Sequence, residues 1–230
     1  MPEETSRTFN HFALHAFSDA YWALMPEARE ELRSEWLAGL RAAAPIVHLF
    51  QPTESGVDLV SWCALPVEGP EAAAAPARFF DCWAKANNAR QPYVRTVQTL
   101  WGFTRPSQYT KTRSTQEIDP FSETRRRYLV IYPFVKTTEW YLMGRESRQG
   151  MMNEHIRIGK QYEEISQLLL YSFGLQDQEF VVVYEMDDLA RFSDLVNELR
   201  STDGREYTLR DTPVHTAIYH PAEETLALWA

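Results

Sequence analysis

The sequence predicts an α+β fold made of two ferredoxin-like repeats, with antiparallel sheets and helices packed outside them. The first observation behind this prediction is an internal repeat. An offset of 119 residues aligns Y-W-A-L-M-P-E-A-R, which begins at Tyr21, with W-Y-L-M-G-R-E-S-R, which begins at Trp140, and sets Trp36 on His155. The segments A-R-F-F-D and A-R-F-S-D follow in the same order in the two halves. The second observation is that each half shows the order strand, helix, strand, strand, helix, strand, which indicates a duplication.

The first half contains four strand-like runs and two helical patterns. Alternation of apolar and polar residues, or a short apolar run beside turn residues, predicts strands at 9–17, 46–50, 57–65 and 93–103. Pro26 suits the first position of a helix, because the N–H that it lacks has no partner there. Apolar residues follow at four-residue spacings to about Ala43, and residues 72–87 form a second helical pattern.

The second half repeats this order of elements. Strands are predicted at 128–134, 167–173, 179–185 and 214–219, and helices at 145–162 and 189–199. In the first of these helices, apolar residues and one histidine recur at spacings of three or four, which places them on one face: Met151, Met152, His155, Ile158 and Tyr162. Asp187 and Asp188, at the start of the second helix, are read as N-terminal capping residues.

These patterns divide the chain into an N-terminal half (1–104), a linker (105–127) and a C-terminal half (128–230). The linker carries two prolines, few large apolar residues and the run R-R-R at 125–127. A solvated connection would have this composition. A functional loop is at least as well favoured, because a structureless segment of this length is uncommon inside a compact protein.

Composition limits the classes of function. The chain has 230 residues, 44% of them hydrophobic, so it can bury a sizeable core. Its net charge of −9 argues against nucleic-acid binding. No apolar run is long enough to span a membrane, and the N-terminus has no apolar signal core. Cys63 and Cys82 form no zinc or redox motif and are expected to be free thiols in a reducing cytoplasm. Phosphate-loop, dinucleotide-binding, zinc-protease and nucleophile-elbow motifs are absent.

Four motifs of the C-terminal half together resemble the chlorite dismutase superfamily, most closely its coproheme decarboxylase branch. They are Y-P-x-x-K from Tyr132, E-W-Y, E-H-x-x-x-G-x-x-Y around His155, and S-F-G-L-x-D. The resemblance extends from about Arg127 to Leu226 and covers the first half only in element order and aromatic content. It implies a fold of the dimeric α/β-barrel type, a heme or iron coproporphyrin III as cofactor and substrate, hydrogen peroxide as oxidant, and a homo-oligomer, usually a pentamer.

His155 is the candidate iron ligand. A single histidine on an apolar helix face is more often a packed core residue than a ligand. The resemblance implies ligation instead, because Glu154, Gly159 and Tyr162 match the spacing around the family's proximal histidine. Neutral imidazole suits iron, and an acceptor on its other ring nitrogen would fix the tautomer. The family takes this acceptor from the segment after the last long helix, where Asp203 is the best match and Glu206 the alternative.

Tyr132 and Lys136 are the candidates beside the porphyrin propionates. Without the motif, Tyr132 would be read as ordinary strand packing and Lys136 as a solvated lysine. In the decarboxylase branch, the tyrosine before this proline lies over the propionates, where it becomes a radical and abstracts hydrogen from one of them. The lysine four residues later lies near the same groups and can pair with a carboxylate.

Gln167 is the candidate residue above the iron. Chlorite dismutases place an arginine seven residues before the glycine of their G-L-D turn, and here this count from Gly174 reaches Gln167. The alignment requires a one-residue gap, so Leu168 is an alternative. Neither side chain carries the charge that holds an anionic oxidant, which argues against chlorite chemistry and is compatible with hydrogen peroxide.

The linker contributes weaker candidates for binding porphyrin carboxylates. R-P-S-Q-Y-T from Arg105 and R-S-T-Q-E-I-D-P from Arg113 are similar to loop segments of the superfamily that have this role. Tyr109, Arg113 and Ser114 are the residues implied. In a loop, such side chains usually only meet water.

The sequence therefore leads to one principal hypothesis and three alternatives. The principal one is peroxide-dependent oxidative decarboxylation of two propionates of iron coproporphyrin III to give heme b. A chlorite dismutase, a weak heme peroxidase and a non-catalytic heme-binding protein remain as alternatives. Because Trp36 occupies the place of His155 in the first half, one ligand site per chain is expected.

Overall fold

The computed structural model describes residues 7–109 and 114–230. Its strands are β1 (Arg7–Phe17), β2 (Ile46–Pro52), β3 (Leu59–Val67), β4 (Val94–Phe103), β5 (Tyr128–Lys136), β6 (Ser166–Tyr171), β7 (Phe180–Met186), β8 (Thr208–Arg210) and β9 (His215–Tyr219). Its helices are α1 (Asp19–Trp22), α2 (Pro26–Ala43), α3 (Ala75–Asn88), α4 (Thr138–Leu142), α5 (Arg145–Gly159), α6 (Leu189–Leu199), the 3-10 turn η1 (Asp203–Tyr207) and α7 (Ala222–Ala227).

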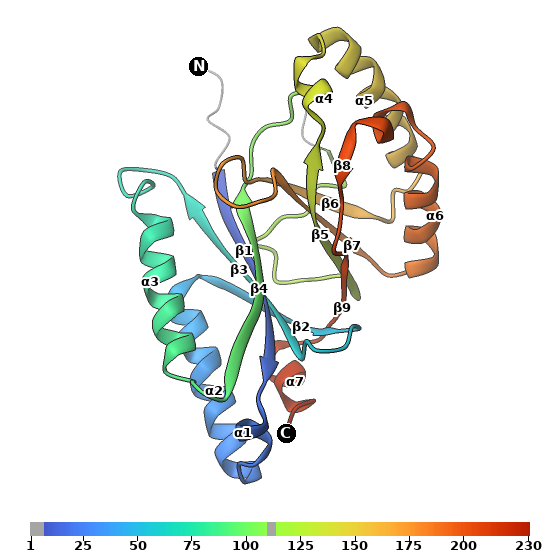
Figure 1. The fold of residues 1–230 in the computed structure, drawn as a ribbon. Coiled ribbons are helices and arrows are strands. Elements are labelled where there is room, and N and C mark those ends of the chain that lie inside the picture. The colour runs from blue at the N-terminus through green and yellow to red at the C-terminus, as the bar shows by residue number, and fades with distance from the viewer. Residues whose placement is uncertain (1–6, 110–113) are drawn as a thin grey trace.

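The strands of the described residues form one antiparallel sheet that closes on itself. Their order is β7-β6-β4-β1-β3-β2-β9-β5-β8, and β7 also pairs with β5. Every strand except β8 therefore belongs to a closed ring, and β8 is attached to β5. The two halves meet at two seams: β2 pairs with β9 over three residues, whereas β4 pairs with β6 at a single position. The predicted α+β class, with antiparallel strands and outer helices, is confirmed (Figure 1).

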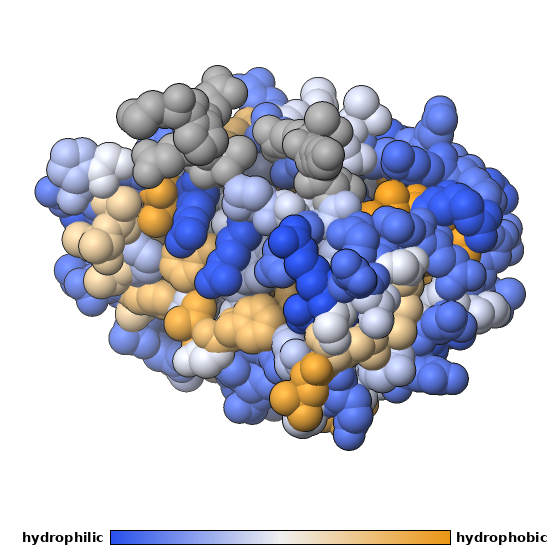
Figure 2. Space-filling view, turned by 90° about the horizontal axis from the view of Figure 1, so that it is seen from above, coloured by the Kyte–Doolittle hydropathy of each residue, from blue (hydrophilic) through white to orange (hydrophobic). Residues whose placement is uncertain are grey.

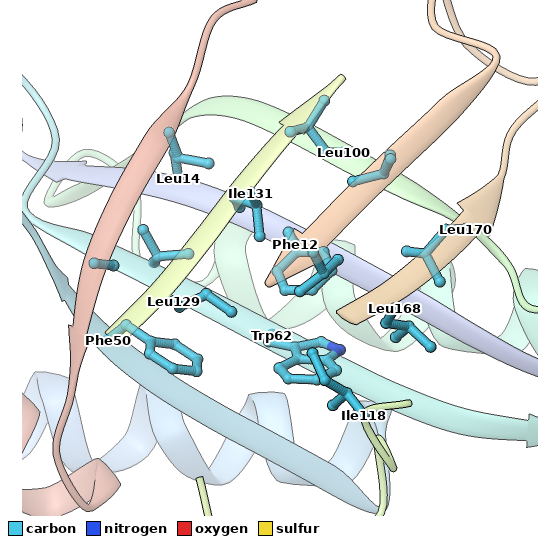
Figure 3. Close-up of a cluster of buried hydrophobic side chains, with 14 of the residues drawn as sticks. Phe12, Leu14, Phe50, Trp62, Leu100, Ile118, Leu129, Ile131, Leu168 and Leu170 are labelled. Carbon is cyan, nitrogen blue, oxygen red and sulfur yellow. The ribbon is translucent and has the colours of Figure 1, made fainter. Parts of the chain in front are cut away.

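Side chains on the inner faces of the strands fill the ring. Phe12 of β1, Trp62 of β3 and Leu129 of β5 are buried there with Leu168 of β6 and Val183 of β7. Figure 3 shows that side chains from the strands of both halves point toward one another in this cluster. Alternate residues of each strand point outward, because successive side chains of a strand lie on opposite faces. Each half therefore presents an outer face for its helices.

The outer helices cover one half each (Figure 1). α2 and α3 lie over the first half, where buried aromatic side chains such as Trp36 and Phe79 pack. α5 and α6 lie over the second half, where Ile158 and Leu195 pack against Tyr184 of β7. Both pairs of helices use the apolar stripe that the sequence predicts.

The structure corrects the predicted end of one helix. α5 ends at Gly159, three residues before the predicted end at Tyr162. The side chain of Gln116, in the linker, donates hydrogen bonds to the carbonyl oxygens of Gly159, Tyr162 and Ile165. These contacts satisfy carbonyl groups that have no partner within a helix end. Short elements that lack a full period were not predicted: α1, α4, η1, β8 and α7.

The end of the linker is anchored inside the ring. Arg125 forms an ion pair with Glu185 of β7 at 3.2 Å, and both side chains are buried. The guanidinium of Arg125 also lies 5.1 Å from the centre of the Trp62 ring. The linker is thus joined to strands of both halves, because Trp62 belongs to β3 and Glu185 to β7.

Gly102→Ala should destabilise the single-pair seam between β4 and β6. A Cβ at Gly102 would lie 2.6 Å from the Ser172 hydroxyl and 2.7 Å from the Tyr171 carbonyl oxygen, so the backbones must separate. We expect a loss of about 1–3 kcal/mol in the free energy of unfolding, measured by urea denaturation. The matched control is Gly150→Ala in α5, where nothing lies within 4 Å of the added Cβ and a gain of roughly 0.5–1 kcal/mol is expected. Equal effects of the two substitutions would contradict the close approach at this seam.

Candidate functional site

The candidate site lies between α5 and the outer face of β5, β7 and β6. Ile158, near the C-terminal end of α5, and Tyr162, just beyond the helix, are buried against Val130 and Tyr184. His155 lies one turn before Ile158 and is half-buried. The helical spacing that singled out His155 in the sequence thus directs it toward the sheet.

The strand register determines which side chains face α5. Tyr132 of β5 and Leu169 of β6 both pair with Val182 of β7, and Gln167 pairs with Tyr184. Directly paired residues of antiparallel strands lie on the same face. Since Tyr184 packs against α5 and α6, the side chains of Tyr132, Gln167 and Leu169 lie on the side of His155. Leu168, the alternative to Gln167, lies in the inner cluster instead.

This outer face is incompletely covered, unlike its counterpart in the first half. Gln167 is exposed, and 40% of Leu169 remains accessible. On the corresponding face of β1, Phe9, His11 and His15 are at most 1% accessible. α2 and α3 therefore cover the outer face of β1 completely, whereas α5 and α6 leave an open apolar strip along β6 on the second half. A flat apolar ligand has room along this strip.

The linker borders this strip along β6. The backbone N–H of Gln167 donates to the carbonyl oxygen of Gln116 at 2.8 Å, and the N–H of Ile118 donates to the carbonyl oxygen of Gln167 at 3.0 Å. Gln167 is thereby held through its backbone on the linker side. Its side-chain amide remains exposed and can donate or accept hydrogen bonds.

His155 is held in its neutral form. Burial, together with the charge of Lys136, lowers its pKa from 6.5 to about 4. Within the described residues, neither ring nitrogen of His155 forms a hydrogen bond, and no group of three or more metal-binding side chains occurs. A neutral, unbonded imidazole fits the role of a single protein ligand to an iron whose other ligands come from a porphyrin.

Lys136 lies close to His155 rather than at a solvated position. Its ammonium donates to the carbonyl oxygen of Gly204 at 2.9 Å and lies 4.3 Å from the centre of the Trp140 ring. Its backbone N–H donates to Glu179 at 2.9 Å. Burial and the neighbouring Arg205 lower the pKa of Lys136 to about 8. The charge is therefore fixed at the end of β5, beside the imidazole.

The two carboxylates considered as partners of His155 lie on a segment that packs near α5 but are not hydrogen-bonded to the imidazole among the described residues. Asp203 and Glu206 belong to η1, and both side chains are exposed. No hydrogen bond joins either carboxylate to His155 in the part of the chain that the structure describes. The contact that η1 makes toward the site is the Gly204 carbonyl, which receives the ammonium of Lys136.

Tyr132 lies against a second tyrosine. Its ring is stacked on that of Tyr184 with 6.2 Å between the centroids. Burial, followed by interaction with Tyr184, raises the pKa of Tyr132 well above its ordinary value. The phenol therefore keeps its O–H at physiological pH. The negative charge of Asp211, which forms an ion pair with Arg200 at 3.2 Å, also raises the pKa of Tyr132.

A hollow of about 700 Å³ lies beside the N-terminal part of α5. It is lined by linker residues and by one flank of the helix: Ser107, Gln108, Tyr109, Arg145, Arg148, Gln149 and Asn153. The Gln149 amide donates to the Tyr109 carbonyl at 3.2 Å, which ties the linker to the helix. His155 does not line this hollow. Figure 2 shows hydrophobic and strongly hydrophilic side chains together on the face seen from above.

The linker candidates have different positions. Tyr109 lines the hollow, whereas Ser114 is exposed and its hydroxyl accepts from the backbone N–H of Gln116. Arg113 lies outside the described residues. The sequence reasoning missed Arg145 and Arg148. Helical spacing offered a signal for Arg148, because it precedes His155 by seven residues, which is two turns on the same side of a helix.

Among residues 7–109 and 114–230, no helix combines the length and the apolar composition needed to cross a membrane.

Comparison with known proteins gives a consistent family match. A family model for chlorite dismutase matches residues 84–219, which is more than half of the chain. The coproheme decarboxylase of Mycolicibacterium smegmatis is 35% identical over 100 residues, covering 44% of this chain and 43% of that protein. A Halobacterium salinarum protein, named as a candidate heme-binding protein, is 36% identical over 136 residues, covering 51% of this chain and 26% of that protein. Each match thus spans less than half of the relative's length.

Solved structures show the same fold. A mutant chlorite dismutase from Candidatus Nitrospira defluvii superposes with a TM-score of 0.82 at 20% identity, covering 97% of this chain and 95% of that one. The chlorite dismutase of the same organism in complex with imidazole gives a TM-score of 0.81 at 19% identity, with 96% and 94% covered.

Lys136→Met should raise the pKa of His155 toward 6.5. A neighbouring positive charge disfavours the protonated ring, so removing the charge makes protonation easier. The measurement is an NMR titration of the His155 ring protons in the ligand-free protein. Lys160→Met is the matched control, because Lys160 is exposed at the end of the same helix and should leave the titration unchanged. An unshifted His155 in Lys136→Met would show that the two groups do not interact.

Proposed function

Since the chain belongs to the chlorite dismutase family, we propose that it is a heme-type oxidoreductase that decarboxylates two propionates of iron coproporphyrin III to give heme b, with hydrogen peroxide as oxidant. The observation that carries the proposal is that His155 on α5, neutral and without a hydrogen bond to any described residue, faces an open apolar strip that carries Tyr132 and Gln167. The name of the Mycolicibacterium smegmatis relative supports the choice of reaction.

In this proposal, His155 holds the iron of the porphyrin substrate, and the apolar strip of β6 and β7 packs against the porphyrin plane. The bound iron porphyrin supplies the redox chemistry. The protein supplies position and electrostatics. Because burial and Lys136 keep His155 uncharged, its ring nitrogen is available without first losing a proton. Lys136 also keeps one positive charge at this end of the site, where it opposes the negative charges of the propionates.

Tyr132 is the proposed relay between the oxidant and a propionate. Its raised pKa keeps the hydrogen on the phenol, so that the residue can give up a hydrogen atom and then take one from the propionate side chain. Each propionate loses carbon dioxide, one proton and two electrons and becomes a vinyl group. One hydrogen peroxide accepts the two electrons, the proton released from the propionate and one further proton from solvent, and becomes two molecules of water. Tyr184, stacked on Tyr132, is placed to accept a hydrogen bond from its phenol.

Gln167 favours peroxide over chlorite as the oxidant in this proposal. Its exposed amide lies on the same face as Tyr132 and has no charge with which to hold an anion. The neutral peroxide molecule needs only hydrogen bonds. We extend the proposal to a homo-oligomeric ring in the cytoplasm, usually a pentamer in this family.

Titration with iron coproporphyrin III tests the binding part of this proposal. We expect a shifted Soret band on addition of the porphyrin and a loss of most of this shift in His155→Ala. Addition of hydrogen peroxide should then give a product whose mass is lower by two carboxyl groups. Binding without conversion would favour a carrier, and rapid oxygen release from chlorite would favour a chlorite dismutase. The absence of any spectral change would refute the proposal.

Tyr132→Phe should keep porphyrin binding and lose conversion by a factor of at least about 100, because phenylalanine has no hydrogen atom to transfer. The matched control is Tyr128→Phe, which alters the same strand and the same face four residues earlier and should convert at the wild-type rate. Mass spectrometry of the products over time measures both rates. Undiminished conversion in Tyr132→Phe would exclude the relay role.

A further inference from the structure

One exposed tyrosine of the second half donates its hydroxyl to a carboxylate. Tyr141 of α4 is 37% accessible, and its O–H donates to Oε2 of Glu179, just before β7. The same carboxylate oxygen accepts the backbone N–H of Lys136 at 2.9 Å, so Glu179 is held from two sides. A phenol that loses an electron becomes strongly acidic, and a base within hydrogen-bond distance can take its proton in the same step. Tyr141 can therefore be oxidised without leaving a positive charge on its ring.

The phenol of Tyr141 keeps its hydrogen until it is oxidised. Partial burial, followed by the interaction with Glu179, raises the pKa of Tyr141 far above its ordinary value. Arg148 acts on this pKa in the opposite direction and more weakly. The phenolate is therefore not formed at physiological pH. Oxidation must move the electron and the proton together, and Glu179 is the proton acceptor already in place.

A second tyrosine–carboxylate pair among the described residues lacks this accessibility. The hydroxyl of Tyr162 donates to Glu198 at 2.6 Å, but Tyr162 is only 3% accessible. The guanidinium of Arg191 also lies 4.5 Å from the centre of its ring, and a positive charge over a ring opposes removal of an electron from it. Within the described part of the chain, no cation lies over the ring of Tyr141. Exposure and charge thus both favour Tyr141.

Aromatic rings connect Tyr141 with the strand that carries Tyr132. The ring centroids of Tyr141 and Phe173 are 6.1 Å apart, and those of Phe173 and Phe180 are 4.8 Å apart. Phe180 in turn lies 5.6 Å from Phe134. Phe134 follows Tyr132 by two residues, so both lie on the same face of β5, roughly 7 Å apart along the strand. These rings form a continuous row along which an electron can pass between Tyr141 and Tyr132 in short steps.

The tryptophan next to Tyr141 is a poorer end point for oxidation. Trp140 is buried, and the ammonium of Lys136 lies 4.3 Å from the centre of its ring. This charge opposes a positive charge on the indole. An oxidising equivalent that reaches α4 is therefore stabilised on Tyr141, at the surface.

We propose that Tyr141 and Glu179 form a surface site of proton-coupled electron transfer, at which the protein accepts single electrons from small soluble reductants such as ascorbate. Tyr141 loses one electron along the row of rings and its phenolic proton to Glu179, which leaves a neutral tyrosyl radical and a carboxylic acid. The reductant then returns one electron to Tyr141 and releases its own proton to solvent, and Glu179 returns the phenolic proton. The source of the oxidising equivalent, the peroxide-dependent site, rests on the proposed function, whereas the chemistry of the pair does not.

The first test uses the full chain without porphyrin and photogenerated tris(bipyridine)ruthenium(III) as the one-electron oxidant. The wild type should form a neutral tyrosyl radical, followed by absorption and electron paramagnetic resonance, and form it more slowly in deuterium oxide. Tyr141→Phe should lose most of the tyrosyl signal. Glu179→Gln keeps the shape of the side chain and an acceptor for the N–H of Lys136 but is no base, and it should form the radical roughly 100-fold more slowly.

Tyr162→Phe is the matched control, because it removes the buried pair and should change neither the rate nor the yield of the radical. Near-ultraviolet circular dichroism of each variant checks that the fold is retained. An undiminished tyrosyl signal in Tyr141→Phe would overturn the site. An unchanged rate in Glu179→Gln would overturn the role of this carboxylate as proton acceptor, as would equal rates in the two forms of water.

The second test adds iron coproporphyrin III, hydrogen peroxide and ascorbate to the full chain. The wild type should oxidise ascorbate, whereas Tyr141→Phe should lose this oxidation and still convert the porphyrin. Ascorbate oxidation that persists in Tyr141→Phe would overturn the connection with the peroxide-dependent site. A wild type that neither binds nor converts the porphyrin would overturn the proposed function, while the photochemical test still decides whether the pair acts as inferred.

Discussion

Pairing of β5 with β7 closes the sheet, and the rest of the structure depends on that closure. In a closed ring, every strand is paired on both sides, so no strand edge is left free. The inner side chains of both halves therefore meet in one shared core. Trp62 and Phe12 from the first half meet Leu168 and Val183 from the second in that core. The helices can then pack only on the outside. The candidate site is consequently an outer-face site, formed by a helix and the back of three strands rather than by the ring's interior.

The two outer faces share the same order of strands and helices but carry different side chains. In the first half, Trp36 on α2 is fully buried and its indole N–H donates to Asn87. In the second half, the aligned residue is His155, which is half-buried and unbonded within the described residues. The outer face of β1 is fully buried in one half, whereas Gln167 and Leu169 of β6 remain exposed in the other. The proposed ligand site therefore belongs to the second half, where His155 takes the place of Trp36.

The fold and the position of His155 followed from local patterns, because periodicity is a property of neighbouring residues. The end of α5 did not, because Gln116, which is distant in sequence, fixes it. The choice between Gln167 and Leu168 could not be made from the sequence, since a one-residue change of register exchanges the two faces of a strand. The register of β6 on β7 places Gln167 outside and Leu168 inside. The contact of Lys136 with η1 was equally inaccessible, because it joins segments separated by α5 and α6.

The linker is fixed to the rest of the fold at three separated points. Thr104 is bonded to Thr8 of β1 at one end, Gln116 is bonded to Gln167 and to the end of α5, and Arg125 is buried beside Trp62. Closing a longer loop between two fixed points costs only about 0.6 kcal/mol for each doubling of its length. Insertions between Thr104 and Gln116 can therefore reshape the wall of the hollow at little thermodynamic cost, while the ring and α5 keep their geometry.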